Sequence, residues 1–171
     1  MKDRLVTFNT NGLRNPTKRK QCFQYLKRHR ADIIFLQETH CASETEIETW
    51  TKEWGGDGIW NNYRSNSRGT AILWKKNSEF IVQKISTTHE GRTIIAMLSY
   101  NKLNVMIINI YAPNSVKDRK HYFTMLTEHI SKISNDYAID SIICGGDFNC
   151  VVDSTRDKLT AGICNDSSVR D

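Results

Sequence analysis

The stretch "SIICGGDFNC", residues Ser141 to Cys150, decides the fold because it runs from an apolar strand directly into polar chemistry. Three apolar residues follow Ser141, two glycines interrupt them, and an acid, an aromatic ring and an amide come next. A short apolar run ended by glycines is typical of a buried strand that stops at a turn. The same pattern recurs upstream, so other strands of the chain are also predicted to end in polar residues.

Apolar runs of strand length occur along the whole chain. Most are nearly continuous in Ile and Val, which is typical of strands covered on both faces. The predicted strands are "RLVTF" (4–8), "DIIFL" (32–36), "TAILW" (70–74), "TIIAMLSY" (93–100), "NVMIINIY" (104–111) and "SIIC" (141–144). Helical patterns over 18–30, 43–54 and from Ser115 onward supply the cover, whereas "GGDG" (55–58) and "NNYRSNSRG" (61–69) indicate loops. A mixed α/β domain with helices outside its sheets is expected.

Composition favours an ordinary globular protein with one domain over residues 1–171, since 39% of its residues are hydrophobic and 25% charged. No run approaches the roughly 20 apolar residues that cross a bilayer, and no signal peptide is evident, so an intracellular, soluble protein with no membrane partner is expected. Five cysteines without C-x-x-C spacing argue against a disulfide framework and a zinc ribbon. The net charge of +5 mildly favours a polyanionic partner.

Four predicted strands end in polar clusters. These clusters hold Asn9 and Asn11; Gln37, Glu38 and His40; Tyr111 and Asn114; Asp147 and Asn149. Each cluster alone fits a turn or a helix cap. Together they indicate one site at the carboxyl ends of the strands, with oxygen ligands that suit Mg²⁺ or Mn²⁺. Glu38 and Asp147 are the candidates to hold metal and orient water for phosphodiester hydrolysis.

Five motifs, "FNTNGLR", "FLQETH", "RGTAILW", "NIYAPN" and "GGDFN", occur in this order between Leu5 and Cys150. They resemble the successive motifs of the endonuclease/exonuclease/phosphatase superfamily, the fold of exonuclease III and of apurinic/apyrimidinic (AP) endonucleases. The resemblance implies a four-layer α/β sandwich of the exonuclease III or DNase I type, in which helices flank two packed sheets. It also implies a Mg²⁺-dependent deoxyribonuclease, with Mn²⁺ as a possible substitute.

Site roles follow from the resemblance position by position. The implied metal ligands are Glu38, Asn9, Asp147 and Asn149; the implied catalytic residues are Asp147, Tyr111 and Asn149; the implied phosphate contacts are Asn11 and Asn114. Arg64 and Arg68, in the polar loop before "GTAILW", are further phosphate candidates, because loop arginines near a site often position a nucleic-acid backbone.

Within the superfamily, "QETH", "NIYAPN" and "GDFN" look most like the endonuclease domain of LINE-type retrotransposons; the DNA-repair branch usually has lysine where His40 stands. The retrotransposon branch nicks chromosomal DNA. The resemblance therefore implies DNA as the partner, a monomer, nuclear localisation and fusion to a reverse transcriptase. The family ends in Ser-Asp-His, and no Asp-His dipeptide occurs here. A domain incomplete at its C-terminus is therefore expected. A catalytically inactive nucleic-acid-binding remnant and a phosphomonoesterase of the same fold are the alternatives.

Overall fold

The computed structural model describes residues 4–88 and 90–150, which fall into two compact units. Of the described residues, the first unit contains those up to Tyr111 and from Ile139 to Asp147, and the second contains Ala112–Ala138 and residues 148–150. The first unit holds β1 (Leu5–Asn9), α1 (Pro16–Arg28), β2 (Ile33–Gln37), α2 (Glu44–Trp54), β3 (Asp57–Asn61), β4 (Thr70–Trp74), β5 (Ile81–Thr87), β6 (Thr93–Tyr100), β7 (Leu103–Tyr111) and β8 (Ser141–Asp147). The second holds α3 (Val116–Asp136).

The first unit contains two four-stranded sheets, ordered β1-β2-β4-β3 and β5-β6-β7-β8. β1 runs parallel to β2 and β7 runs parallel to β8, while the other neighbours are antiparallel. Parallel partners end at the same edge of a sheet. The register accordingly places Asn9 opposite Gln37 in one sheet and Tyr111 opposite Asp147 in the other.

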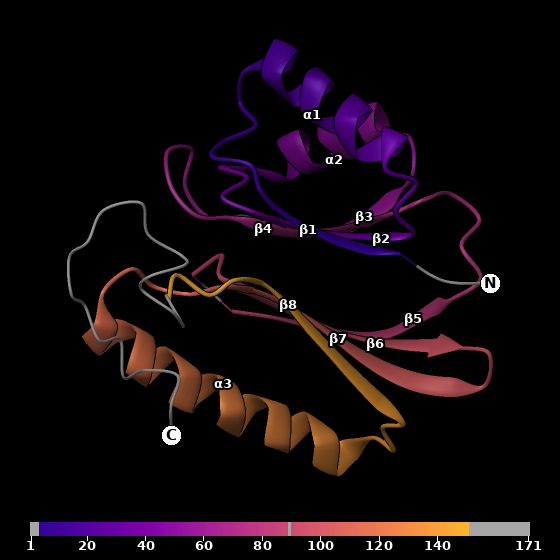
Figure 1. Ribbon diagram of the computed structural model, residues 1–171, viewed down its shortest axis with the longest axis vertical. Helices are drawn as coiled ribbons and strands as arrows, with labels where there is room; N and C mark the ends of the chain where they lie inside the picture. Colours follow the sequence, from indigo (N-terminus) through magenta and orange to yellow (C-terminus); the bar gives the residue numbers. More distant parts are fainter. Residues whose placement is uncertain (1–3, 89, 151–171) are drawn as a thin grey trace, which may run out of the picture. The chain divides into compact units, whose positions relative to one another are not determined.

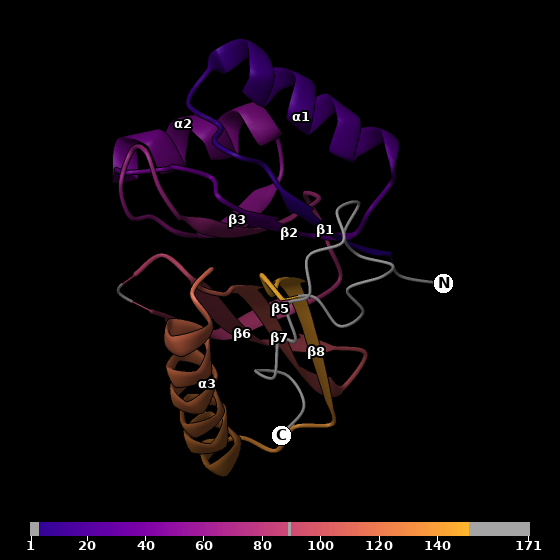
Figure 2. The same cartoon turned by 60° about the vertical axis from the view of Figure 1, so that its left-hand side comes forward.

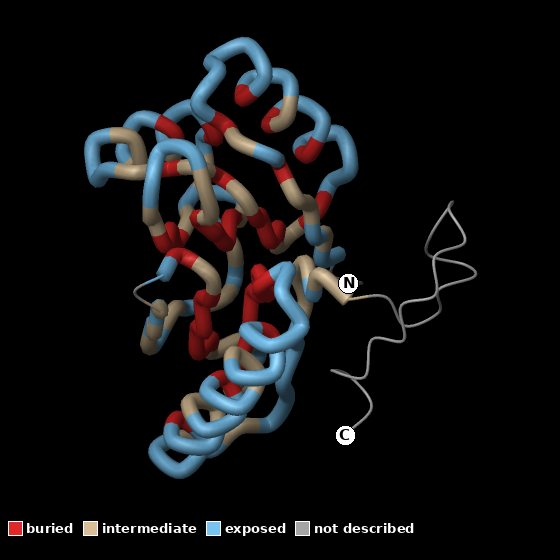
Figure 3. The backbone as a smooth tube through the Cα atoms, turned by 90° about the vertical axis from the view of Figure 1, so that its left-hand side faces the viewer, coloured by how far each residue is buried: buried red, intermediate tan, exposed pale blue. Residues whose placement is uncertain are grey.

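Helices α1 and α2 cover one face of the β1–β4 sheet, and the β5–β8 sheet packs against its other face (Figures 1 and 2). Alternate residues of β2 point to opposite faces, as the pleat requires. Ile34 and Leu36 pack in the cluster with Phe23 of α1, whereas Phe35 packs between the sheets with Ile107. Figure 3 shows that most of α1 is exposed and that buried positions recur singly along it.

The starts of α1 and α2 are defined by ordinary caps. The Asn15 side chain accepts a hydrogen bond from the Lys18 N–H, and Pro16 occupies the first turn. Ser43 caps α2 in the same way, and Gly55 ends it with φ of 73°. These caps place α1 and α2 directly after the polar ends of β1 and β2.

The second unit is built around α3, which begins directly after Ser115, where the helical pattern was predicted to start. Ser115 accepts a hydrogen bond from the Asp118 N–H, and the buried Arg119 donates to the carbonyls of Pro113 (3.0 Å) and Asn114 (2.8 Å). Asn149 Nδ2 donates to the Ala112 carbonyl at 2.7 Å. Within this unit, the segment that follows β7 is thereby tied to the segment that follows β8.

The α/β fold class is confirmed, and each predicted strand is present within a few residues of its expected bounds. Two strands were not predicted. The "GGDG" loop prediction is wrong at its end, because β3 begins at Asp57. A Cβ added at Gly58 would lie 2.5 Å from Leu73 Cδ2, so a larger residue here would require the Leu73 side chain to move. β5 is an edge strand whose exposed and half-buried residues alternate, which obscures its apolar signal.

The membrane, cysteine and domain expectations do not depend on the strand pattern. The described helices include none that is long and apolar enough to cross a membrane. Cys22, Cys41 and Cys144 are free thiols, and burial raises the pKa of Cys41 to about 12. The expectation of a single domain over 1–171 stays a prediction, and residues 151–171 lie outside the described part of the chain.

Candidate active site

Two carboxylates converge on one amide at the strand ends. Asn9, the last residue of β1, donates from Nδ2 to Glu38 Oε1 at 2.9 Å and to Asp147 Oδ2 at 2.8 Å. Its Oδ1 accepts from the Asn11 N–H at 3.0 Å. The ends of β1, β2 and β8 therefore meet at a single point, as their polar residues predicted. The carboxylates of Glu38 and Asp147, which should repel each other, are held together by shared hydrogen bonding.

The backbone at Glu38 is strained and tightly held. Glu38 has φ of 52°, in the left-handed region that non-glycine residues seldom adopt. Its carbonyl accepts hydrogen bonds from the Thr10 hydroxyl (2.8 Å) and the Gly12 N–H (2.7 Å). His40 Nε2 lies 3.8 Å from Glu38 Oε2, and burial lowers the pKa of His40 although the Glu38 charge opposes this. These contacts fix the direction of the Glu38 side chain.

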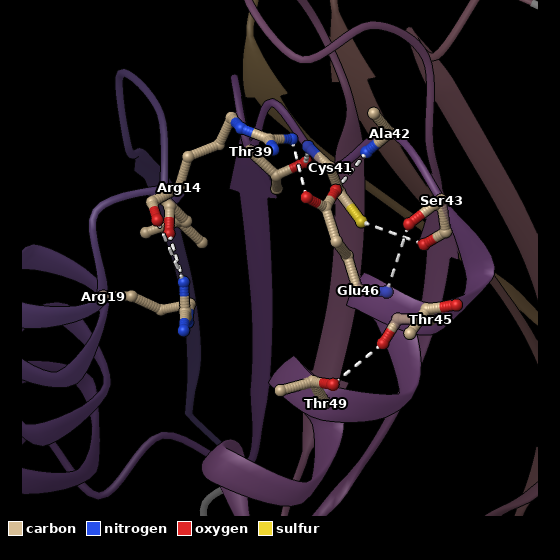
Figure 4. A network of polar contacts seen from close by, with 10 residues as sticks. Arg14, Arg19, Thr39, Cys41, Ala42, Ser43, Thr45, Glu46 and Thr49 are labelled. Carbon is tan, nitrogen blue, oxygen red and sulfur yellow. Dashed lines mark hydrogen bonds and ion pairs between the residues drawn. The ribbon is translucent and has the colours of Figure 1, made fainter.

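The loop that follows Glu38 is anchored to the start of α2 (Figure 4). Ser43 Oγ accepts from the Glu46 N–H at 3.3 Å as the helix cap, and the Glu46 carboxylate reaches back to accept from the Ala42 N–H at 2.8 Å, one residue before the cap. Arg14 Nη1 lies 2.7 Å from Glu46 Oε1. The loop from β1 and the loop from β2 are thus joined through one glutamate outside the candidate site.

Tyr111 brings a phenol to the same carboxylate. The residue is 8% exposed, and burial, followed by its hydrogen bond to Glu38, raises the pKa of Tyr111 to about 12. The positive charge of the Arg92 guanidinium, 5.1 Å from the ring centroid, lowers the pKa of Tyr111 but does not outweigh these two effects. The hydroxyl therefore keeps its proton at neutral pH and can donate a hydrogen bond.

A buried amide between the two sheets holds the strand that leads to Glu38. Asn109 of β7 is fully buried; its Nδ2 donates to the carbonyls of Leu36 and Ala71, both at 2.9 Å, and its Oδ1 accepts from Gln37 Nε2 at 2.8 Å. These bonds join the two sheets one residue before Glu38. Sequence reasoning missed Asn109, although a lone amide inside the apolar run "NVMIINIY" was the available signal.

The remaining predicted residues have different surroundings. Asn11 is exposed, and its carbonyl accepts a hydrogen bond from Lys18 Nζ. Arg68 lies in the loop before β4 and pairs with Glu90 at 2.9 Å. Asn114 and Asn149 belong to the second unit. The structure thus brings together Asn9, Glu38, Tyr111 and Asp147.

The donor set at this point fits a hard divalent cation. Among residues 4–88 and 90–150, no group of three or more His, Cys, Asp and Glu side chains could hold a metal ion. Mg²⁺, however, is commonly bound by one or two carboxylates, with substrate oxygens and water completing its shell. Glu38 and Asp147 supply that number of carboxylates. The observed hydrogen bonds of Asn9, from Nδ2 to both carboxylates and from the Asn11 N–H to Oδ1, give Asn9 a positioning role, and its role as a metal ligand stays a prediction.

Gly69 is expected to tolerate no side chain, because it has φ of 87° and an added Cβ would lie 2.4 Å from Thr39 Oγ1. Gly69→Ala should lower the free energy of unfolding by about 2–3 kcal/mol, through strain and displacement of the loop after Glu38. Gly55→Ala is the matched control, since it has φ of 73° and its nearest neighbour, Lys27 Nζ, would lie at 3.7 Å. Gly55→Ala should lower the free energy of unfolding, measured with urea, by about 1 kcal/mol. Equal losses for both variants would refute the clash.

Comparison with known proteins gives matches over most of the chain. The Endonuclease/Exonuclease/phosphatase family profile matches residues 6–163. The 149 kDa protein of transposon TX1 from Xenopus laevis is 31% identical over 154 residues, which make up 90% of this chain and 11% of that protein. An exodeoxyribonuclease of Bacillus subtilis (strain 168) is 29% identical over 117 residues, or 66% of this chain and 43% of its own. The chain thus spans less than half the length of either relative.

Solved structures share the fold at lower sequence identity. An AP endonuclease from Archaeoglobus fulgidus superposes with a TM-score of 0.63 at 20% identity, over 86% of this chain and 58% of that one. The resemblance inferred from the five ordered motifs, including the similarity to a transposon protein, is confirmed by these comparisons.

Proposed function

Because the chain belongs to the endonuclease/exonuclease/phosphatase family, we propose that it hydrolyses phosphodiester bonds of DNA with the help of a divalent cation, Mg²⁺ or Mn²⁺. The observation that carries this proposal is the convergence of Glu38 and Asp147 on the amide of Asn9. Two carboxylates at one point, on strand ends held by a buried network, offer a rigid oxygen site for a cation and a phosphate. The similarity to an exodeoxyribonuclease and to a transposon protein supports DNA as the substrate.

Each site residue has a role that its surroundings allow. Glu38 and Asp147 would hold the cation, whose contribution when bound is to offset charge on the phosphate and its leaving group. Asp147 would also orient the attacking water, with Asn149 as the proposed partner. Tyr111, which keeps its proton, would turn its hydroxyl from Glu38 and donate to a phosphate oxygen once the Glu38 carboxylate holds the cation. Asn11, Asn114 and Arg68 are the proposed contacts to the substrate phosphates.

The proposed biological setting follows from the transposon relative. We propose that the domain nicks target DNA in the nucleus and is natively joined to a reverse transcriptase, and that it acts as a monomer. The similarity over 154 residues to a 149 kDa transposon protein, of which they are 11%, supports the proposal that the domain is natively part of a larger chain.

The proposed activity is tested with supercoiled plasmid incubated with the 171-residue chain in Mg²⁺ or in EDTA. Nicking to open circles is expected in Mg²⁺ alone, with 3′-hydroxyl ends that a DNA polymerase can extend. A sugar phosphate monoester is the control substrate, assayed for released inorganic phosphate. Phosphate release without nicking would replace the proposal with a phosphomonoesterase, and plasmid binding without either reaction would replace it with a noncatalytic DNA-binding domain.

A further inference from the structure

A second cluster of charge lies next to the candidate site, where one carboxylate bridges two arginines. Glu90 Oε2 is 2.9 Å from Arg68 Nη1 and 3.7 Å from Arg92 Nε. The two guanidinium side chains are 27% and 12% exposed, whereas the Glu90 side chain is 65% exposed. The cluster therefore has two fixed positive groups beneath one anion at the surface.

Both arginines are attached to the backbone of the candidate site. The carbonyl of Arg68 accepts from the His40 N–H at 2.9 Å, so Arg68 is fastened to the loop that carries Glu38. The carbonyl of Arg92 accepts from the Tyr111 N–H at 2.8 Å, and Arg92 Nη1 donates to the Tyr111 carbonyl at 3.1 Å. A ligand held by Arg68 and Arg92 would accordingly lie beside Glu38 and Tyr111.

The arginines are held in place before any ligand arrives. The Gly69 N–H donates to the Gly91 carbonyl at 3.1 Å, which joins the two loops that carry them. The Arg68 guanidinium stacks 4.7 Å from the ring centroid of Tyr63, and that of Arg92 lies 5.1 Å from the ring centroid of Tyr111. Ordering these side chains on binding would therefore cost little conformational entropy.

The bridging carboxylate is the group that a ligand can most readily displace. Glu90 lies between Thr88 and Gly91, whose N–H donates to the Thr88 carbonyl, and most of the Glu90 side chain is in water. An exposed ion pair contributes little to stability. A phosphodiester presents two nonbridging oxygens that share one negative charge, as the two oxygens of a carboxylate do, and guanidinium groups bind both kinds of anion.

We propose that Arg68 and Arg92 form a second phosphate site, which binds the DNA phosphate next to the one at Glu38 and Asp147, and that Glu90 occupies this site until DNA displaces it. The inference rests on the proposed function. It assigns to the site a substrate with at least two neighbouring phosphates along a strand, as a nucleic acid has and a phosphomonoester lacks. Glu90 thereby becomes a group that limits DNA affinity.

The first test measures binding of a fluorescein-labelled duplex of about 20 base pairs by anisotropy, in EDTA so that no cleavage occurs. Glu90→Gln should bind about two- to fivefold more tightly than the parent chain, because DNA no longer has to displace the Glu90 carboxylate. The slope of log affinity against log salt concentration should stay the same, because both complexes make the same phosphate contacts. The control for net charge is Asp32→Asn, which removes an equivalent partner from the Asp32–Lys75 pair (2.9 Å) at the opposite end of β2. It should leave affinity within about 1.5-fold.

The second test asks whether the two residues act at one place. Arg68→Ala should weaken binding about threefold to tenfold and reduce the salt slope by about one. In the Arg68→Ala background, Glu90→Gln should gain no more than Asp32→Asn does, since the site is already lost. Equal gains from Glu90→Gln in both backgrounds, or inorganic phosphate at millimolar concentration competing fully with the duplex, would overturn the proposal of a strand-binding site.

Failure of this inference can be told apart from failure of the proposed function. Plasmid nicking combined with an unchanged affinity of Glu90→Gln would remove the second phosphate site and leave the nuclease. The predicted binding changes without nicking would leave the phosphate site and remove the hydrolysis.

Discussion

Replacing Glu38 with glutamine is expected to slow Mg²⁺-dependent plasmid nicking about 1,000-fold, which corresponds to about 4 kcal/mol in the activation barrier. Glutamine keeps an oxygen that can accept from Asn9 and Tyr111 but removes the charge that would hold a divalent cation. The urea unfolding midpoint should therefore change little. Binding of Mn²⁺, followed by electron paramagnetic resonance, should be lost in the same variant, which gives a readout independent of turnover.

Glu46→Gln is the matched control for the Glu38 variant. Glu46 is a half-buried glutamate eight residues further along, but its carboxylate pairs with Arg14 and the Ala42 N–H instead of Asn9. Its loss should lower stability by about 1 kcal/mol and leave the nicking rate within about threefold. If both variants lose activity equally, Glu38 has no special role, and the proposed site is wrong.

Replacing Asn109 with leucine is expected to lower the free energy of unfolding by about 3–4 kcal/mol. Leucine has a similar size, but the carbonyls of Leu36 and Ala71 lose their side-chain donor, and Gln37 Nε2 keeps only Thr7 Oγ1 of its two acceptors. Each buried polar group left without a partner costs about 1–3 kcal/mol. Urea unfolding followed by tryptophan fluorescence measures the change, as a fall of about 1–2 M in the midpoint.

Asn104→Leu is the control for Asn109, because it makes the same change in the same strand at a half-buried position. It should alter the free energy of unfolding by no more than about 0.5 kcal/mol. A similarly small effect of Asn109→Leu would mean that the bonds between the sheets contribute little and that the site is held by apolar packing alone.

The strand ends were predictable because each signal is local. A run such as "TAILW" predicts its strand directly, and the polar residues after β1, β2, β7 and β8 indicate which edge of the sheets carries chemistry. The family resemblance then adds which carboxylates matter. It also selects the sandwich from the several folds that alternating strands and helices allow.

Contacts across the sheets were less accessible to sequence reasoning. Asn9 and Asp147 lie 138 positions apart, and their contact depends on the packing of β1 against β8. Asn109 is hidden inside an apolar run, and its partners are backbone carbonyls, which have no sequence signature. Arg92 was missed for a similar reason: its relation to Tyr111 follows from the β6–β7 register, in which Thr93 lies opposite Ile110.

The central claim is that Glu38 and Asp147 act together on one phosphodiester, and the nicking rate of a double variant tests it most directly. Glu38→Gln and Asp147→Asn should each slow Mg²⁺-dependent plasmid nicking about 1,000-fold, and the double variant should be no more than about tenfold slower than either, because groups that act as a unit are not additive. Losses that multiply to about a million-fold, or a parent chain that does not nick DNA at all, would contradict the account.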